Sequence, residues 1–428
     1  MKQNVERGKT ILIDGPACVA LYSGTLRAFG AQIKAGEHLI VRMGRRIPLE
    51  AIEDSQVEIL LGNFASYSVI EEDPIPPSWK NAAEKILSSS DGRIGVTVLG
   101  GIDSGKTSFC IYLANMALNS GRRVALIDGD LGQSDIGPPG TLGLSIVRRP
   151  FVDPFNLNPD HMIFIGVTNP YNVTEQVING LVKLRDKALS MGSDFIIINT
   201  DGWIEGFEAI SYKCNLIKNL EPKFTVIMWD NEDIKPIMDL LTSAGTKIEI
   251  LAADVPKNIR KRDRETRKAI RETLYKKYLR NGKVRSIPLS WIKVNGNIEI
   301  RGKMDQALKK KIEEIVGSKL VYCENLQNHI ILVLREGTSL SNEERAKLTA
   351  ELNKPVKAMC KGDEKGLIVA LENDEGEMLG IGTICGIDFE RGTLKIYTNV
   401  EESVSSVHVG QIRLDEKGNE IEVVRRNT

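Results

Sequence analysis

A glycine-rich segment between an apolar run and an amphipathic run constrains the fold of this chain more than any other feature. Residues 100–107 read Gly-Gly-Ile-Asp-Ser-Gly-Lys-Thr and fit the phosphate-loop pattern G-x-x-x-x-G-K-[ST]. The apolar run at 96–99 predicts a buried strand before the loop, and residues 108–118 predict a helix after it. Backbone N–H groups of such a loop turn toward a phosphate at a helix N-terminus. The segment therefore predicts a strand, loop and helix that bind a nucleotide.

Each position of this loop has an expected role. Lys106 is expected on the β- and γ-phosphate oxygens of ATP, and the Thr107 hydroxyl on Mg²⁺. The alternative is a glycine turn without a ligand, which the flanking strand and helix disfavour. The predicted ATP-binding residues are Gly100, Gly101, Ile102, Asp103, Ser104, Gly105, Lys106, Thr107 and Ser108.

Composition excludes several classes of protein. No apolar run approaches the roughly 20 residues of a membrane helix, and the N-terminus lacks a hydrophobic signal core, so we expect a cytoplasmic protein without a membrane partner. Six cysteines without a C-x-x-C pair indicate reduced thiols, with a zinc site or disulfide framework as the alternative. Equal numbers of acidic and basic residues, 57 of each, argue against indiscriminate nucleic-acid binding.

A chain of 428 residues is expected to form two or three domains. Short β-branched runs punctuated by glycine predict an N-terminal β domain over residues 1–70. Residues 71–92 predict a proline-rich linker with a short helix at 79–87. Residues 93–285 predict a phosphate-loop kinase domain that ends in a basic lid helix, and residues 286–428 predict a C-terminal β-rich domain.

Strand-like and helix-like runs alternate in the middle of the chain, which favours the α/β class with a mostly parallel, doubly wound sheet. Ligands of such sheets lie at the carboxyl ends of the strands. The predicted strands after the phosphate loop are 124–127, 162–165, 195–198, 225–229 and 248–251, and the predicted helices are 175–191, 208–219 and 233–244.

Two carboxylates, Asp128 and Asp130, follow the strand predicted at 124–127. One can hold Mg²⁺ or its waters, and the other can accept a proton from the attacking group, as in-line phosphoryl transfer requires. A helix N-cap is the alternative for Asp128 taken alone. The expected metal-binding residues are Thr107, Asp128 and Asp130.

A strongly basic segment lies between Arg260 and Arg285, where twelve Lys or Arg stand against three acidic residues. Its arginines at 260, 264, 267 and 271 recur at helical spacing, which predicts a row on one helix face. Such a row suits a clamp for a transferred phosphate or an RNA backbone. The alternative is a solvated helix face.

Further short motifs complete a pattern that is specific as a set. They are Gly15-Pro16-Ala17, Asp128-x-Asp130-x-Gly132-Gln133 followed by Pro139-Gly140-Thr141, Thr168-Asn169-Pro170, and Asn199-Thr200-Asp201-Gly202-Trp203. With the phosphate loop and the arginine segment, they resemble the polyribonucleotide 5′-hydroxyl kinases over nearly the whole chain, in an archaeal-like form. That family comprises the ATP-dependent RNA kinases of pre-mRNA cleavage, tRNA splicing and the nucleolus.

The resemblance implies transfer of the γ-phosphate of ATP to a 5′-hydroxyl end of RNA, with DNA as a second acceptor, and implies RNA-processing protein partners. It makes Asp130 the base toward the 5′-hydroxyl with Gln133 nearby, and the implied catalytic residues are Lys106, Asp130, Gln133, Arg264 and Arg267. The implied RNA-binding residues are the clasp Thr168, Asn169 and Pro170, then Gly202, Trp203, Arg260 and Arg271. One departure is Pro170-Tyr171 after Asn169, where the eukaryotic members are expected to have Thr-Pro-Gly.

Trp203 suits its implied role independently, because RNA ends are commonly held by stacking on aromatic faces. An ordinary core tryptophan is the alternative.

Two other functions compete with the kinase. A phosphate-loop GTPase or partitioning ATPase would show an N-K-x-D motif or a lysine at the start of the loop, and neither is present. An ATP-holding scaffold would need none of the acceptor-side residues.

Overall fold

The structure is a computed structural model that describes residues 1–229, 232–243 and 247–423. Residue contacts divide the chain into two units, Met1–Arg271 and Glu272–Thr428. The division falls inside helix α6 (Arg264–Tyr278). The predicted division into three domains therefore stays a prediction, since the first unit holds both the N-terminal β domain and the phosphate-loop domain.

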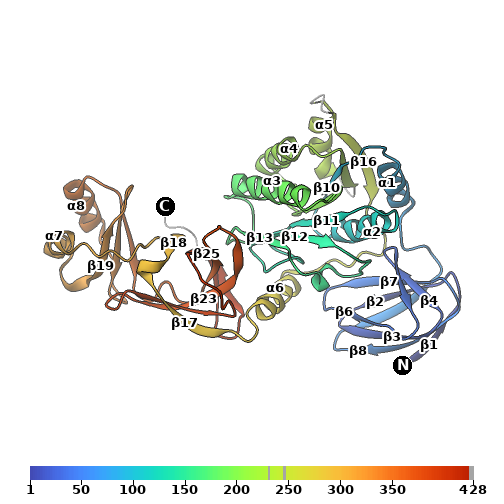
Figure 1. The fold of residues 1–428 in the computed structure, drawn as a ribbon, viewed down its shortest axis with the longest axis horizontal. Helices are drawn as coiled ribbons and strands as arrows, with labels where there is room; N and C mark the ends of the chain where they lie inside the picture. The colour runs from blue at the N-terminus through green and yellow to red at the C-terminus, as the bar shows by residue number, and fades with distance from the viewer. Residues whose placement is uncertain (230–231, 244–246, 424–428) are drawn as a thin grey trace. The chain divides into compact units, whose positions relative to one another are not determined.

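The N-terminal residues form two antiparallel sheets, as their glycine-punctuated apolar runs predict (Figure 1). Side chains of β3 and β8 alternate between buried and more exposed positions, so each strand contributes one face to the core. The first sheet has the order β1 (Lys2–Val5), β8 (Ser55–Leu61), β3 (Ala17–Ser23) and β6 (His38–Val41). The second has the order β5 (Ala31–Lys34), β4 (Thr25–Ala28), β7 (Arg46–Ala51), β2 (Thr10–Asp14) and β9 (Ser66–Ile70).

The central sheet has seven strands, of which five pair in parallel and two are added at one edge through antiparallel pairs. The parallel strands inside the sheet are almost entirely buried, because helices cover both of their faces, whereas the parallel strand at the edge is partly exposed. The order is β13 (His161–Phe164), β12 (Thr141–Val147), β11 (Val124–Gly129), β14 (Phe195–Thr200), β10 (Ile94–Leu99), β15 (Phe224–Trp229) and β16 (Glu249–Asp254). The predicted mostly parallel α/β sheet is therefore observed.

Helices lie on both faces of this sheet (Figure 1). On one face α1 (Pro77–Leu87) and α2 (Lys106–Asn119) share a core with the N-terminal strands. On the other face lie α3 (Thr174–Ser190), α4 (Phe207–Leu220) and α5 (Lys235–Ser243). The helix predicted at 233–244 matches α5 after a short 3₁₀ turn at Glu232–Ile234, and Ala244 lies outside the described residues.

The N-terminal β domain is joined to the central domain by buried polar contacts as well as apolar packing. The Asn115 side chain, fully buried in α2, donates to the carbonyl oxygens of Phe29 and Phe151 at 2.7 and 2.8 Å. It also accepts from the Phe151 backbone N–H at 3.0 Å. These bonds use the side-chain nitrogen twice and the side-chain oxygen once. Because the amide is buried, they hold the β domain in one position beside α2.

The second unit is rich in strands, as predicted, but it also contains two helices that were not predicted among its described residues. Its larger sheet has the order β17 (Lys283–Pro288), β24 (Thr393–Thr398), β23 (Met378–Asp388), β22 (Leu367–Glu372), β25 (Ser406–Leu414) and β18 (Lys293–Gly296), with β26 (Glu420–Val423) beside β25. A smaller sheet packs on α7 (Gln306–Val316) and α8 (Asn342–Leu352), and its strands are β19 (Leu320–Asn325), β20 (Ile330–Leu334) and β21 (Val356–Cys360). Asp305 and a Ser341–Glu344 capping box start these two helices, which is a local signal the strand-based prediction did not use.

Within the described ranges, none of the helices is both long enough and apolar enough to span a membrane.

Candidate active site

One cavity of about 810 Å³ in the first unit is lined by most of the predicted site residues, and those that do not line it are Gly100, Gly101, Asp128 and Arg264. Its size lies within the usual range for small-ligand sites, roughly 300–1,000 Å³. The carboxyl ends of β10, β11 and β14 form its base, as expected for an open α/β sheet. Its wall segments include residues 102–108, 130–133, 168–170 and 201–203 and the arginine segment after β16.

The backbone of the phosphate loop restricts which residue types can occupy several of its positions. Gly105 has φ +94°, and a Cβ on Gly100 would lie 2.6 Å from Ser104 Oγ and 2.7 Å from Met228 Cβ. Asp103 also has a left-handed backbone, with φ +55°. Positive φ is open to glycine and tolerated by aspartate, which explains both residue types in the loop.

Lys106 begins α2 and is buried under its own loop, where Nζ donates to Gly101 O at 2.6 Å. Burial lowers the pKa of Lys106 to about 8, with Lys213 acting in the same direction and Asp130 and Asp201 opposing it. At neutral pH the ammonium therefore stays largely protonated, as a phosphate-binding group must be.

A hydrogen-bonded chain joins the loop hydroxyl to the first acidic residue. Asn199 Nδ2 donates to Thr107 Oγ1 at 3.3 Å and to Asp128 Oδ1 at 3.1 Å. The other carboxylate oxygen, Asp128 Oδ2, accepts the backbone N–H of Asp135 at 2.6 Å. Burial, with Asp135 and Asp130 nearby, raises the pKa of Asp128 to about 7. Asp128 thus orders the loop beneath the cavity, and Asn199 is a site residue to which the sequence motif alone assigned no role.

Asp130 directly follows the carboxyl end of β11 and lines the cavity. Its Oδ1 accepts the backbone N–H groups of Gly132 and Gln133, both at 3.0 Å. Its Oδ2 accepts no hydrogen bond from the part of the chain that the structure describes. Burial raises the pKa of Asp130, Asp201 adds to that rise, and Lys106 opposes it. A carboxylate with one anchored oxygen, one available oxygen and a raised pKa suits a proton acceptor.

Gln133 connects the acidic loop to the arginine segment. Its Nε2 donates to Gly132 O at 2.7 Å and to Arg267 O at 3.3 Å. Its Oε1 is buried without a hydrogen-bond partner among the described residues. A buried amide oxygen without a donor is costly, so this atom is a candidate acceptor for a ligand hydroxyl or bound water.

The predicted clasp, Thr168 to Pro170, lies directly beside the acidic loop and lines the cavity. A Cβ added to Gly132 would lie only 2.9 Å from Thr168 O, so the two loops are in close backbone contact. Asn169 Oδ1 accepts the Tyr171 backbone N–H at 2.9 Å, which closes a local turn at the position where the motif departs from the expected pattern.

Trp203 lies in an aromatic cluster at the edge of the cavity. Its ring stacks on Tyr212, with centroids 5.8 Å apart at 25°, and meets Tyr171 edge to face at 5.6 Å. Gly202 brings the ring close to the phosphate loop, because a Cβ there would lie 2.9 Å from the Ile102 backbone N. Trp203 is only half-buried, so it is neither an ordinary core tryptophan nor a free side chain.

A buried ion pair beneath Trp203 was not predicted from the sequence. Lys213 is completely buried, and its Nζ lies 2.8 Å from Asp201 Oδ2. Asp201 also accepts from the Trp203 backbone N–H at 3.0 Å and from the Tyr212 hydroxyl at 2.9 Å. The pair therefore orients both rings of the stack. Its twelve-residue separation, from a strand end to a helix interior, is the reason no local pattern shows it.

The arginine segment differs from its prediction. Residues 260–263 are not helical, because Asp263 Oδ1 accepts the Thr266 backbone N–H at 2.7 Å and caps a helix that starts at Arg264. The predicted single row of four arginines on one helix is therefore wrong. Arg264 is exposed and is not among the cavity residues. The arginines of this segment that line the cavity are Arg260, Arg262, Arg267 and Arg271.

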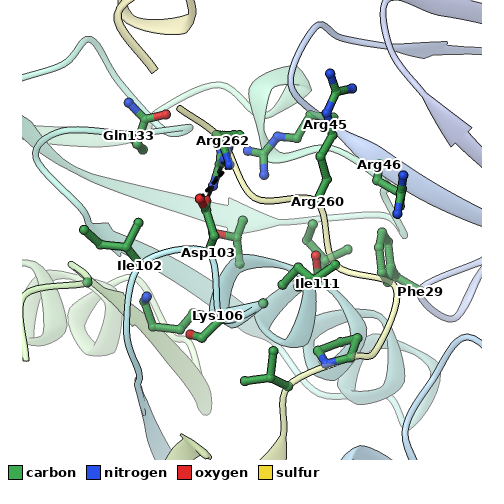
Figure 2. Close-up of a pocket in the computed structure, with 18 of the residues that line it drawn as sticks. Phe29, Arg45, Arg46, Ile102, Asp103, Lys106, Ile111, Gln133, Arg260 and Arg262 are labelled. Atoms are coloured by element: carbon green, nitrogen blue, oxygen red, sulfur yellow. Dashed lines mark hydrogen bonds and ion pairs between the residues drawn. The ribbon is translucent and has the colours of Figure 1, made fainter. Parts of the chain in front are cut away.

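The N-terminal β domain also contributes cavity residues, which were not predicted from sequence. Arg46, Arg45 and Phe29 lie at the end of the cavity away from Lys106 (Figure 2). Arg45 is held by an ion pair with Asp135, and Arg46 pairs with Asp14 at 2.6 Å. No motif marks these residues, because they reach the cavity only through the packing of one domain on another.

The donor set at the strand ends fits Mg²⁺. A hydroxyl (Thr107) and a carboxylate (Asp130) line the cavity beside the phosphate loop, and Mg²⁺ typically takes one or two carboxylates together with substrate phosphates and water. Among the described residues there is no cluster of three or more His, Cys, Asp or Glu that could hold a metal.

A protein-family model matches this part of the chain. Residues 100–281 fit the family described as the mRNA cleavage and polyadenylation factor CLP1 P-loop. The match begins at the first glycine of the phosphate loop and ends after the arginine segment, so it includes every predicted catalytic residue.

Curated relatives cover more of the chain. The polyribonucleotide 5′-hydroxyl-kinase of Methanocaldococcus jannaschii is 29% identical over 82% of this chain and 96% of its own length. The enzyme of the same name from Pyrococcus furiosus is 27% identical over 82% of this chain and 96% of its own length. A CLP1 homologue from Nematostella vectensis is 26% identical over 62% of this chain and 65% of its own length. These findings confirm the resemblance that the motifs predict.

A solved structure of the Clp1p–Pcf11p complex has the same fold. It superposes with a TM-score of 0.65 at 13% identity and covers 96% of this chain and 97% of its own. The likeness confirms an α/β phosphate-loop fold for the central domain.

Proposed function

We propose that this relative of the archaeal polyribonucleotide 5′-hydroxyl-kinases is itself an ATP-dependent RNA kinase, which transfers the γ-phosphate of ATP to the 5′-hydroxyl at an RNA end. One observation carries the proposal: a single cavity is lined by the phosphate loop, by Asp130 and by Trp203. A GTPase would need the phosphate loop and a strand-end carboxylate but no aromatic group for an acceptor base, and a scaffold would need the loop alone.

In the proposed reaction the RNA 5′-oxygen attacks the γ-phosphorus in line with the leaving oxygen of ADP. The P–O bond to ADP breaks as the new P–O bond forms, and the hydroxyl proton passes to the Asp130 carboxylate. Lys106 balances negative charge on the β- and γ-phosphates from the floor of the cavity. The proposed base and the proposed phosphate ligand thus follow the ends of β11 and β10, the two strands that flank β14.

The acceptor is proposed to lie between the clasp and the aromatic cluster, with its terminal base on Trp203. Arg267 and Arg271 are proposed to contact phosphate groups, while Arg264 is left out because it lies outside the cavity. Arg260 pairs weakly with Asp14, at 3.7 Å, and remains a proposed RNA or phosphate contact.

Mg²⁺ is the proposed metal, held by the Thr107 hydroxyl and the ATP phosphates, while Asp128 supports Thr107 through Asn199 and Asp130 accepts the proton. When bound, it would neutralise charge on the phosphates. The proposed setting is the cytoplasm, in which the unpaired cysteines of the described chain would stay reduced. RNA-processing proteins are the proposed partners, and DNA is a proposed second acceptor.

The function is tested by incubating the protein with γ-labelled ATP, Mg²⁺ and 5′-hydroxyl oligonucleotides of RNA and of DNA with the same sequence. We expect label on the 5′ end of the RNA. The same RNA with a 5′-phosphate is the matched control and should take no label. ATP hydrolysis that leaves both 5′-hydroxyl oligonucleotides unlabelled would favour the GTPase-like or scaffold reading.

The acceptor site predicts different salt responses for Trp203 and Arg267. Loss of stacking in Trp203→Ala should cost about 1–3 kcal/mol of RNA binding, which raises the KM for RNA about 5- to 150-fold. The salt dependence of that KM should not change, because stacking involves no counterion release. Arg267→Ala should weaken RNA use and reduce the salt slope by about one charge. The measurement is the KM for RNA at several salt concentrations, with ATP affinity measured in parallel.

Two variants serve as controls for this comparison. Arg264→Ala removes an exposed arginine from the same helix and should behave like the parent. Trp203→Phe retains an aromatic face over Tyr212 and should recover most of the affinity. If Trp203→Ala and Arg267→Ala both use RNA as the parent does, the acceptor binds elsewhere.

A further inference from the structure

Asp103 belongs to the phosphate loop, yet its side chain points from the loop toward the arginine segment (Figure 2). Its Oδ1 accepts from Arg262 Nε at 2.8 Å and pairs with a terminal nitrogen of Arg262 at 2.6 Å. Its Oδ2 accepts from the Arg262 backbone N–H and from a terminal nitrogen of Arg267, both at 2.9 Å. Both carboxylate oxygens are thus used by two arginines more than 150 residues along the chain.

These contacts are well shielded from water. The Asp103 side chain is only 3% exposed, and those of Arg262 and Arg267 are 18% and 29% exposed. Burial alone would raise the pKa of Asp103, but the two arginines outweigh it and lower that pKa. The carboxylate is therefore ionised at neutral pH, and the bonds to it are charge-assisted.

Phosphate binding does not explain a carboxylate at this position. The loop binds phosphate through backbone N–H groups, and a negative charge among them repels the nucleotide. The left-handed backbone, with φ +55°, accepts asparagine as readily as aspartate. The negative charge of residue 103 consequently needs a purpose other than loop conformation or ATP contact.

The two arginines are held to different extents. Arg262 gives its Nε, a terminal nitrogen and its backbone N–H to Asp103. Arg267 gives one terminal nitrogen, and its Nε is buried without a hydrogen-bond partner among the residues that the structure describes. Gln133 accounts for the Arg267 carbonyl oxygen. Arg262 is thus an anchor, whereas Arg267 is oriented but keeps donor capacity inside the cavity.

The segment before α6 is also attached at its other end. Arg46 donates to Asn258 O at 2.8 Å, and Arg260 lies 3.7 Å from Asp14. The N-terminal β domain therefore holds the segment near residues 258–260, and the phosphate loop holds it near residues 262–267. Residues 258–263, which carry most of these attachments, are not helical.

We infer that Asp103 is a positioning residue, a latch that docks the segment 258–267 on the phosphate loop and turns Arg267 toward the transferred phosphate. The docking does not depend on the proposed function, whereas the effect on phosphate transfer rests on it. Loss of the latch should release the arginine segment and slow catalysis without emptying the nucleotide site.

Limited proteolysis with trypsin tests the docking without any RNA or turnover. Asp103→Asn keeps the left-handed backbone and the size of the side chain but removes its charge. We expect cleavage after Arg260, Lys261 or Arg264, identified by mass spectrometry, to become roughly tenfold faster, because opening of the segment is less costly. Glu50→Gln is the matched control, since it removes a carboxylate that pairs with Arg27 on the surface of the β domain. Cleavage at the parent rate in Asp103→Asn, or equal acceleration in Glu50→Gln, overturns the latch.

Steady-state kinetics test the effect on transfer. Asp103→Asn should lower kcat about tenfold or more while ATP affinity changes by less than about threefold, because Arg267 loses its orientation. Arg262→Gln should have the same effect, and the double variant should be no slower than either single variant, since both remove one latch. Additive losses overturn the inference. If neither the parent nor any variant phosphorylates RNA, the proposed function is wrong. The latch is still supported in that case if Asp103→Asn accelerates cleavage by trypsin.

Discussion

Lys106→Ala is expected to lower the rate of phosphate transfer to RNA by at least about a thousandfold, because it removes the charge that balances the transferring phosphoryl group. The same change should leave the fold intact. The Lys106 ammonium donates a hydrogen bond to Gly101 O within its own loop, so its removal breaks no hydrogen bond to another of the described elements. Single-turnover rates measured with labelled ATP, together with thermal unfolding, test both parts.

The control for this variant is Lys183→Ala, which removes an exposed lysine from α3 on the far side of the sheet from α2. It should transfer phosphate at the parent rate. Substantial activity in well-folded Lys106→Ala would remove the phosphate loop from the mechanism. A large fall in its unfolding temperature would instead show that burial of Lys106 serves stability.

Asp130→Asn is expected to reduce kcat by about 10² to 10⁴, because the amide cannot accept the proton of the 5′-hydroxyl. ATP affinity should change much less. The amide oxygen can still accept from the backbone N–H groups of Gly132 and Gln133, so the loop should keep its shape. Rates over a range of RNA and ATP concentrations separate the two effects.

Asp128→Asn provides a contrast, since its carboxylate lies beneath the cavity and holds the loop through Asp135 and Asn199. It should alter stability and metal dependence more than the proton transfer itself. If Asp130→Asn loses ATP affinity as severely as kcat, Asp130 is first a metal ligand and the assignment as base is wrong.

Local sequence predicted the elements of this site whose chemistry depends on neighbours in the chain. The phosphate loop needs glycine at position 105 for its backbone and a lysine directly after it, and both requirements are visible in eight residues. The acids after β11 and the Gly202-Trp203 pair after β14 were found in the same way. Parallel strands with both faces buried place their carboxyl ends together, so the sequence pattern also predicted that these groups would meet.

The helices α7 and α8 and the start of α6 show the limits of that reasoning. The spacing of the arginines at 260, 264, 267 and 271 fits a helix, but the N-cap at Asp263 decides where the helix begins. A capping bond outweighs periodicity there, because residues before the cap cannot take helical geometry. Asp263 and the Ser341–Glu344 pair are local signals, so the starts of α6 and α8 can be predicted from the sequence.

By itself, the sequence determined a phosphate loop after β10, an acidic end to β11 and a Gly202-Trp203 pair after β14, all on a mostly parallel sheet. Only the tertiary structure decided which arginines reach the cavity, that Asp103 holds Arg262 and Arg267, and that Lys213 is buried on Asp201. The physical reason is that these partners lie on different elements. Asp103 and its arginines are more than 150 residues apart, and Asp201 and Lys213 lie at a strand end and inside a helix, so neither set leaves a spacing to detect. Such bonds form only when packing removes both partners from water.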